Sequence, residues 1–304
     1  MNRLSTNGPF DLAETLNSGQ VFHWDEIDFE GHSGFAGCIG NSPPVFIAQT
    51  GPEEIVTTAE TNQQGLFAEA TLLVREQTGS VRQTNPVASY LGLDLPVERI
   101  RATFPENDEF LKEAIHYCPG LRMVRQPVWE CLATFITSSL KQVAHIRDIS
   151  LTLRRRFGNR YEFAGREFFS YPTPEAIAAA GEAELRKCAL GYRAKSLFLT
   201  ARMLKDGEVD LADLARLESN REAHDFLCRF HGVGGKIANC VLLFGCGRVD
   251  AFPIDVWIER VLRKAYRKRL KGPKLQAWAE GYFGPFAGYA QQFLFHYART
   301  GKLD

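Results

Sequence analysis

The sequence lacks the features of membrane, secreted and metal-binding proteins. Its longest apolar run, residues 240–244, is far too short to cross a bilayer, and no apolar segment of a secretory signal stands at the N-terminus. Seven scattered cysteines, never in a C-x-x-C pair, argue against disulfides and against a zinc or iron–sulfur site. We expect a protein that is not secreted, located in the cytoplasm or nucleoid of a prokaryote or the nucleus of a eukaryote, with no metal or other cofactor.

A net charge of either sign is also lacking, because 36 Lys and Arg balance 36 Asp and Glu. The balance hides a division: residues 1–120 hold 6 basic and 17 acidic residues, whereas residues 121–304 hold 30 and 19. Residues 260–274 alone carry eight Lys or Arg and no acidic residue, which suits a phosphate backbone. A nucleic-acid partner explains the basic region. Attraction between an acidic and a basic domain explains the charge division equally well.

Hydrophobic patterning divides the chain into two regions. A length of 304 residues with 45% hydrophobic residues favours more than one core. The N-terminal region has short alternating segments separated by Gly, Asn, Ser and Pro, as in an antiparallel sheet. The predicted strands include residues 21–24, 34–39 and 45–48.

Capped helical periods begin near residue 94 and run to the end of the chain. They predict about ten helices. We therefore expect an α+β fold, with an antiparallel domain at residues 1–93 and a mostly helical domain at residues 94–304.

The most informative stretch begins at Ser219, which forms a capping-box pattern with Glu222 and opens an apolar helix. That helix ends at the sequence H-G-V-G-G, and a second apolar helix begins at Lys236. The pattern predicts a helix-hairpin-helix at about residues 220–245, whose free N–H groups suit a phosphate. Glycine is common in turns between helices, so the hairpin alone is a weak signal. The glycines of the turn are Gly232, Gly234 and Gly235.

Lys236 stands in the first turn of the second helix, where a cation opposes the helix dipole. The simplest interpretation is that the side chain projects into water. Partial burial at a helix N-terminus instead favours the neutral amine that a nucleophilic lysine needs. Nineteen residues further on, Asp255 follows Pro253 and Ile254. It is a candidate helix cap or a candidate catalytic carboxylate, and the two roles are compatible.

These residues together resemble the helix-hairpin-helix DNA glycosylases, specifically the 8-oxoguanine DNA glycosylases. The sequences G-V-G-G-K and P-I-D are similar to the family's catalytic lysine and aspartate segments. The resemblance implies a TATA-binding-protein-like antiparallel sheet domain, followed by a helical domain in two subdomains with the active site between them. Further similar segments are S-G-Q-V-F-H-W at residues 18–24 and the blocks at 120–139, 190–194 and 286–295.

The resemblance also implies roles for single residues. Lys236 would attack the sugar C1′ and form a Schiff base, while Asp255 would orient it and stabilise the developing positive charge. The Gly19 carbonyl would accept the N7–H that 8-oxoguanine has and guanine lacks. The flipped base would be sandwiched and read at its Watson–Crick edge. The residues implied are Cys240 and Phe295 for the sandwich and Gln291 for the edge, although Cys240 and Phe295 taken singly also suit core packing.

Four more residues are implied to contact DNA. Tyr192 matches an intercalating aromatic residue, and Arg193 matches an arginine that contacts the orphaned cytosine. Leu140 and His145 depart from the family's asparagine and arginine, which are aimed at the same cytosine. Leu140 still suits an apolar wedge. We therefore expect a weaker preference for cytosine opposite the lesion.

The sequence thus predicts a monomeric bifunctional DNA glycosylase and AP lyase that excises 8-oxoguanine from duplex DNA, with no membrane partner. One alternative is a monofunctional glycosylase for alkylated bases that uses Asp255 and water and leaves Lys236 without a role. The other is a non-catalytic helix-hairpin-helix protein that only binds DNA. Its binding would depend on salt but not on damage.

Overall fold

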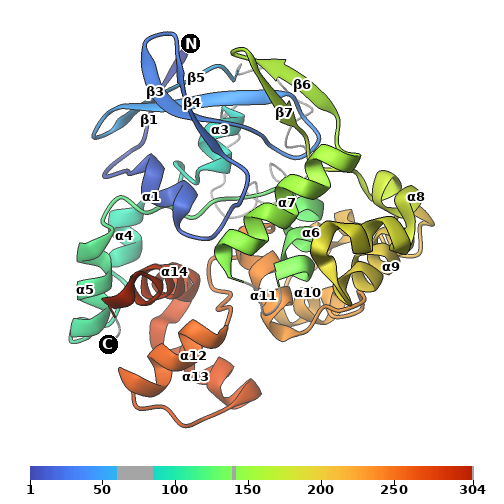
Figure 1. The fold of residues 1–304 in the computed structure, drawn as a ribbon. Helices are drawn as coiled ribbons and strands as arrows, with labels where there is room; N and C mark the ends of the chain where they lie inside the picture. Colours follow the sequence, from blue (N-terminus) through green and yellow to red (C-terminus); the bar gives the residue numbers. More distant parts are fainter. Residues whose placement is uncertain (60–84, 139–141, 303–304) are drawn as a thin grey trace.

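A five-stranded antiparallel sheet forms the first part of the chain (Figure 1). The computed structural model describes residues 1–59, 85–138 and 142–302. The strand order is β1-β5-β4-β3-β2, and every neighbouring pair is antiparallel. This confirms the fold predicted for the N-terminal region. The strands are β1 (Asn2–Ser5), β2 (Asp25–Phe29), β3 (His32–Cys38), β4 (Pro44–Gly51) and β5 (Glu54–Thr57).

Apolar side chains cover both faces of this sheet, because successive residues of a strand point to opposite sides. On one face, Ile47 is buried in a cluster with residues of α1 (Leu12–Asn17) and α3 (Pro86–Tyr90). On the other face, Phe46 is buried in a cluster with Phe168 from much later in the chain. The sheet is therefore a middle layer, and part of its cover comes from the second half of the protein.

The cover on the second face is a β-hairpin at residues 160–169, an element that the helical periods of the sequence did not indicate within the mostly helical domain. Strand β6 (Arg160–Phe163) pairs with β7 (Arg166–Phe169) across a turn at Ala164 and Gly165. Both turn residues have positive φ, 50° and 70°, as a tight hairpin requires. A two-stranded hairpin is marginal alone, and this one is stabilised by packing its aromatic side chains on the sheet.

The prediction of a strand at residues 21–24 is wrong, since these residues form none. All four side chains are buried at the junction between the sheet and the helices. Phe22 meets Phe135 edge-on, with ring centroids 6.5 Å apart. Trp24 Nε1 donates to the Tyr90 hydroxyl at 3.1 Å. Side-chain contacts on both sides replace strand pairing here.

The rest of the described chain is helical, close to the prediction of about ten helices. The predicted capping box of Ser219 and Glu222 is present, and Asp108 and Thr173 also cap helices by accepting a backbone N–H. The α-helices are α4 (Val97–Arg101), α5 (Glu109–Tyr117), α6 (Val128–Ser138), α7 (Val143–Phe157), α8 (Pro174–Leu185), α9 (Arg193–Lys205), α10 (Asn220–Leu227), α11 (Gly235–Phe244), α12 (Val256–Lys264), α13 (Gly272–Phe283) and α14 (Ala287–Tyr297). Short 3-10 or π turns are η1 (Arg186–Leu190), η2 (Leu211–Arg216), η3 (Gly284–Phe286) and η4 (Ala298–Lys302).

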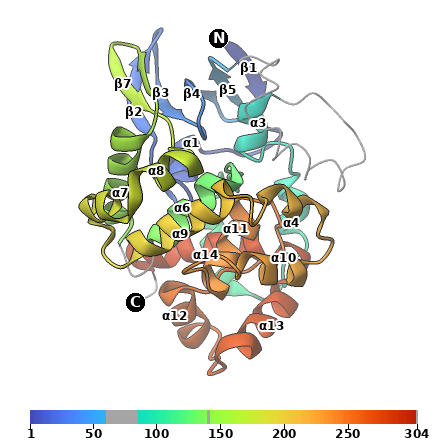
Figure 2. The same ribbon diagram turned by 90° about the vertical axis from the view of Figure 1, so that its right-hand side faces the viewer.

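The helices form two groups below the sheet (Figures 1 and 2). Helices α12, α13 and α5 pack around α14, whereas α9 and α11 pack around α6. The core beneath the sheet contains both Leu93 and Val124, so it includes residues from both sides of the predicted boundary at residue 94. The boundary therefore stays a prediction. Within the described ranges, no helix is long and apolar enough to span a bilayer.

Candidate active site

The predicted hairpin connects α10 and α11, and its shape depends on glycine. Gly232 has φ +77°, and a Cβ at this position would lie 2.7 Å from Ser196 Cβ of α9. Position 232 therefore needs a residue that has no Cβ and that adopts a positive φ easily. Helix α11 begins at Gly235 without a side-chain cap, and both Gly234 and Gly235 are exposed. The N–H groups of its first turn are therefore accessible to an anion.

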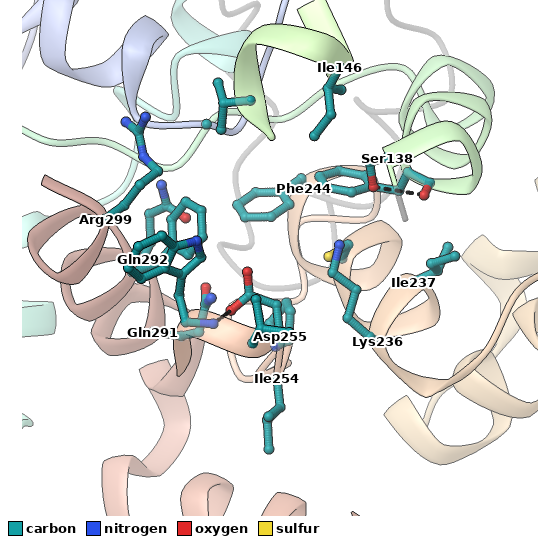
Figure 3. Close-up of a pocket in the computed structure, with 18 of the residues that line it drawn as sticks. Ser138, Ile146, Lys236, Ile237, Phe244, Ile254, Asp255, Gln291, Gln292 and Arg299 are labelled. Atoms are coloured by element: carbon teal, nitrogen blue, oxygen red, sulfur yellow. Dashed lines mark hydrogen bonds between the residues drawn. The ribbon is translucent and has the colours of Figure 1, made fainter. Parts of the chain in front are cut away.

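Lys236 lies in that first turn and is partly buried, so it does not simply project into water. Its Nζ lies 5.1 Å from the centroid of the Phe135 ring, and the side chain extends into a cavity (Figure 3). One helical turn later, the thiol of Cys240 lines the same cavity. Burial raises the pKa of the Cys240 thiol to about 11, although the Lys236 charge opposes the shift. The thiol is therefore neutral at physiological pH.

Asp255 is both the N-cap of α12 and part of the cavity wall. Its Oδ1 accepts the N–H groups of Trp257 at 3.0 Å and Ile258 at 2.9 Å, which fixes the carboxylate. Burial raises the pKa of Asp255, while these N–H groups and the Lys236 ammonium lower it. The two predicted catalytic side chains thus belong to different helices and interact electrostatically across one cavity.

The cavity has a volume of about 1020 Å³, which is enough for a nucleobase and its sugar. Gln291 of α14 is buried, and no described residue donates to its Oε1. A buried amide oxygen without a partner suits a ligand that supplies an N–H. The predicted residues that line the cavity are Gly19, Gly234, Gly235, Lys236, Cys240, Asp255, Gln291 and Phe295.

Gly19 lies against the ring of Phe295 at this cavity. Its φ is +88°, and a Cβ there would lie 3.0 Å from Phe295 Cε1. The next residue, Gln20, is fully buried and holds the segment against residues 122–126. Its Nε2 donates to the Arg122 carbonyl and its Oε1 accepts the Val124 N–H, both at 2.8 Å. The hydrogen bonds of the next residue and the contact with the Phe295 ring therefore fix the position of Gly19.

Other predicted DNA contacts lie outside the cavity wall. Tyr192 is 62% exposed, and the Arg193 guanidinium carbon lies 4.4 Å from the centroid of its ring. His145 is exposed on α7. Leu140 lies outside the described residues. The roles of these four residues stay predictions.

Several cavity residues escaped the sequence reasoning. Phe135, Gln292 and Arg299 line the cavity, as do Trp257 and others. In the sequence, Phe135 has the pattern of an ordinary core residue of α6. Gln292 of α14 and Arg299 of η4, however, are polar residues seven apart in a mostly apolar stretch, and this spacing was an available signal. In the described part of the chain, no three His, Cys, Asp or Glu side chains are arranged to hold a metal ion.

A helix-hairpin-helix with a lysine and an aspartate at one cavity defines a class of DNA repair proteins. Residues 134–276 match the family described as "HhH-GPD superfamily base excision DNA repair protein". Residues 3–132 match the family described as "8-oxoguanine DNA glycosylase, N-terminal domain". The chain belongs to the 8-oxoguanine DNA glycosylases of the HhH-GPD superfamily, and the resemblance drawn from its motifs is confirmed.

Curated relatives agree with this assignment. A "Probable N-glycosylase/DNA lyase" of Methanothermobacter thermautotrophicus is 30% identical over 224 residues, covering 66% of this chain and 71% of the relative. The "N-glycosylase/DNA lyase OGG1" of Arabidopsis thaliana is 27% identical over 305 residues, covering 95% of this chain and 78% of the relative.

Solved structures extend the likeness over almost the whole chain. A protein called MBOgg1, in complex with a low-affinity DNA ligand, superposes with a TM-score of 0.81 and 31% identity, covering 98% of this chain and 95% of its own. The 8-oxoguanine glycosylase/lyase of Clostridium acetobutylicum, with double-stranded DNA containing cytosine opposite 8-oxoG, gives 0.81 and 25%, covering 98% and 93%.

Proposed function

We propose that this protein is a bifunctional DNA glycosylase and AP lyase that excises 8-oxoguanine from duplex DNA. The observation that carries the proposal is the single cavity that joins Lys236, Asp255 and a slot of base size. The relatives named N-glycosylase/DNA lyase support the same activity. The protein needs no metal or other cofactor for this reaction, since both steps can use organic side chains.

Lys236 is the proposed nucleophile. The Lys236 ammonium first gives up a proton, which the departing base takes up. The neutral Nζ then forms a bond to the sugar C1′, the glycosidic bond breaks, and the bonding electron pair leaves with the base. Loss of a proton from nitrogen and opening of the sugar ring then give a Schiff base between Nζ and C1′. Removal of a proton from C2′ expels the 3′ phosphate by β-elimination, which cleaves the strand.

Asp255 stabilises the positive charge that develops on the sugar as the base leaves. A carboxylate acts strongly in a site of low polarity when it is already oriented. The two N–H groups of α12 supply that orientation before substrate arrives. Burial raises the pKa of this carboxyl group, while the N–H group of Ile258 and the Lys236 charge lower it.

The base slot would recognise the lesion by shape and by one hydrogen bond. The flipped base lies between the thiol of Cys240 and the ring of Phe295, while Gln291 reads its Watson–Crick edge. The Gly19 carbonyl accepts N7–H from 8-oxoguanine but faces a lone pair in guanine, which discriminates between the two bases.

Duplex DNA would bind across the exposed hairpin and the mouth of the cavity. The first-turn N–H groups of α11 hold a phosphate, together with Gly232, Gly234 and Gly235 of the turn. Tyr192 and Leu140 enter the base stack, and Arg193 and His145 face the orphaned base. We expect a monomer, because each part of this arrangement comes from one chain.

The test is an excision assay on a duplex with one 8-oxoguanine opposite cytosine, with an undamaged duplex as control. We expect base release and strand cleavage without added alkali, only on the damaged duplex. Lys236→Gln should lose strand cleavage. Release of 3-methyladenine from an alkylated duplex assayed in parallel, without release of 8-oxoguanine, would instead support the alkylated-base alternative. Binding without base release would support a DNA-binding protein.

A further inference from the structure

Three polar side chains from one face of α14 and η4 reach the end of α1. Gln292 Nε2 donates to the Ser18 carbonyl at 3.2 Å, and Arg299 Nη2 donates to the Asn17 carbonyl at 2.8 Å. Between them, His296 Nε2 contacts the Glu14 carboxylate. Residues 292, 296 and 299 follow the i, i+4, i+7 spacing of one helix face. We call these three side chains the α14 clamp; Figure 3 shows Gln292 and Arg299 at the cavity.

The clamp completes the C-terminus of α1. The last carbonyl groups of a helix have no partner within it, and α1 has no basic residue in its last turn. Gln292 and Arg299 satisfy two of these carbonyl groups, and Arg299 also places a cation at the negative end of the helix. The next carbonyl along the chain belongs to Gly19. To this carbonyl the structure records no hydrogen bond from any described residue.

His296 joins the parts of the clamp. In its neutral form, Nε2–H donates to Glu14 while Nδ1 accepts from Arg299 Nη2 at 3.3 Å. The other titratable groups that act on His296 are Asp11, before α1, and Tyr117 of α5, whose ring centroid is 5.9 Å away. Burial lowers the pKa of His296, although the Glu14 carboxylate opposes that shift.

We propose that Gln292, His296 and Arg299 are positioning residues that hold the Ser18–Gly19 turn so that the Gly19 carbonyl is placed to recognise the lesion. The proposal rests on the proposed function, in which that carbonyl accepts N7–H of 8-oxoguanine. If the proposal is right, changes in the clamp affect the two reactions of the protein differently. Base release needs the carbonyl in place, whereas strand cleavage at a preformed abasic site has no base to recognise.

The test compares single-turnover rates of 8-oxoguanine release and of cleavage at a preformed abasic site. Arg299→Met keeps the hydrocarbon beside Phe295 but removes the hydrogen bonds. We expect roughly tenfold slower base release and an unchanged cleavage rate, because small displacements of positioning groups affect only the step that uses them. Arg299→Lys, which can still donate to Asn17, should recover part of the loss. Gly19→Ala should show the same separation of rates.

The control is Tyr297→Phe, which removes a hydrogen bond from the same helix to Glu113 and leaves the clamp intact. Equal losses in both reactions of Arg299→Met, or no loss in either, would overturn the clamp proposal. If the wild-type protein neither releases the base nor cleaves the abasic site, it is the proposed function that fails.

A pH profile gives a second readout that a purely structural role would not move. Protonation of His296 removes the acceptor for Arg299 and places two cations side by side. The ratio of base release to abasic-site cleavage should therefore fall in acid, below the usual histidine pKa of about 6.5. His296→Gln keeps a donor for Glu14 but cannot be protonated, so its ratio should stay flat. A parallel fall in wild type and variant would contradict the proposal.

Discussion

Asp255 both caps helix α12 and lines the cavity. A sequence pattern can place an aspartate at a helix start, but it cannot tell a cap from a reacting group. The structure shows that Oδ1 makes both capping hydrogen bonds. The cap and the proposed chemistry can be separated by substitution, because asparagine also caps helices well.

Asp255→Asn should keep the cap and lose the charge. We expect base release to slow by roughly a hundredfold or more, with little change in unfolding temperature. Asp255→Ala should lose the charge and also about 1 kcal/mol of stability. Single-turnover excision and thermal unfolding of both variants check this. Near-normal excision by Asp255→Asn would reduce Asp255 to a cap.

One residue proposed to face the orphaned base departs from the family pattern. His145 stands where an arginine is expected, and arginine only donates hydrogen bonds, which suits the acceptors of cytosine. We expect excision rates to depend only weakly on the base opposite 8-oxoguanine. His145→Arg should raise the rate opposite cytosine relative to adenine severalfold. A strong cytosine preference in the wild-type protein would refute this expectation.

Single residues were the part of the site that the sequence predicted best. Lys236, Cys240, Asp255, Gln291 and Phe295 line one cavity. The hairpin and P-I-D motifs, together with the resemblance to a known family, indicated all five. The cavity residues that were missed, such as Phe135 and Arg299, come together only through the packing of helices that are distant in sequence.

The hairpin illustrates how an element constrains the site. Helix α11 can present its N-terminus beside the cavity only if the turn before it packs closely on α9, and Gly232 permits that contact. Gly234 offers a matched comparison in the same turn, because a Cβ there would meet no atom within 4 Å.

Gly232→Ala should therefore destabilise the fold by roughly 1–3 kcal/mol, through its positive φ and the contact with Ser196. Gly234→Ala should change the free energy of unfolding by less than about 1 kcal/mol. Denaturant unfolding of both variants measures the difference. Equal stabilities of the two variants would mean that the hairpin does not depend on close packing at Gly232.

Elements were predicted where their signals are local. The capping box predicted at Ser219 and Glu222 is present in the structure. The hairpin at residues 160–169 was missed, although it carries an Ala-Gly turn between aromatic residues, because the surrounding helical periods dominated the interpretation. Its stability comes from the sheet, which is more than a hundred residues away in the chain.

The sheet and the helices are joined through a buried polar cluster. Glu130 of α6 pairs with Arg154 of α7 and accepts the Gly40 N–H at 2.8 Å. Arg154 also donates to the carbonyl of Cys38 at 3.2 Å. His23 lies beside them, with Nδ1 3.5 Å from Glu130. The cluster therefore contains groups from both parts of the chain, all withdrawn from water.

This cluster predicts how stability depends on pH. Burial, followed by the charges of Arg154 and Arg147, lowers the pKa of His23 well below its usual value. In acid the unfolded chain therefore binds a proton at His23 that the folded protein does not bind. The contribution of neutral His23 to the free energy of unfolding is fully present above about pH 6.5 and is lost as the pH decreases.

The free energy of unfolding should therefore decrease from about pH 8 to about pH 5, and His23→Asn should lose part of that decrease. The exposed His116 provides the control, since His116→Asn should leave the slope unchanged. An identical slope in His23→Asn and the wild-type protein would show that His23 does not determine the acid sensitivity.

The division of charge along the chain left two explanations open, and the molecule contains elements of both. Ion pairs such as Asp25–Arg147 at 2.5 Å and Asp94–Arg125 at 2.7 Å join the acidic segment to the basic one. The basic run after Asp255 remains largely exposed, and Arg263 is among its exposed residues. Net charge could not separate these roles because both use the same residues.

The amine that reacts with DNA can be identified directly. The protein is incubated with an 8-oxoguanine duplex and sodium borohydride, and the trapped complex is digested and sequenced by mass spectrometry. We predict a covalent sugar adduct on Lys236, formed only with damaged DNA and absent from Lys236→Gln. An adduct on another amine, or base release without any adduct, would contradict this prediction.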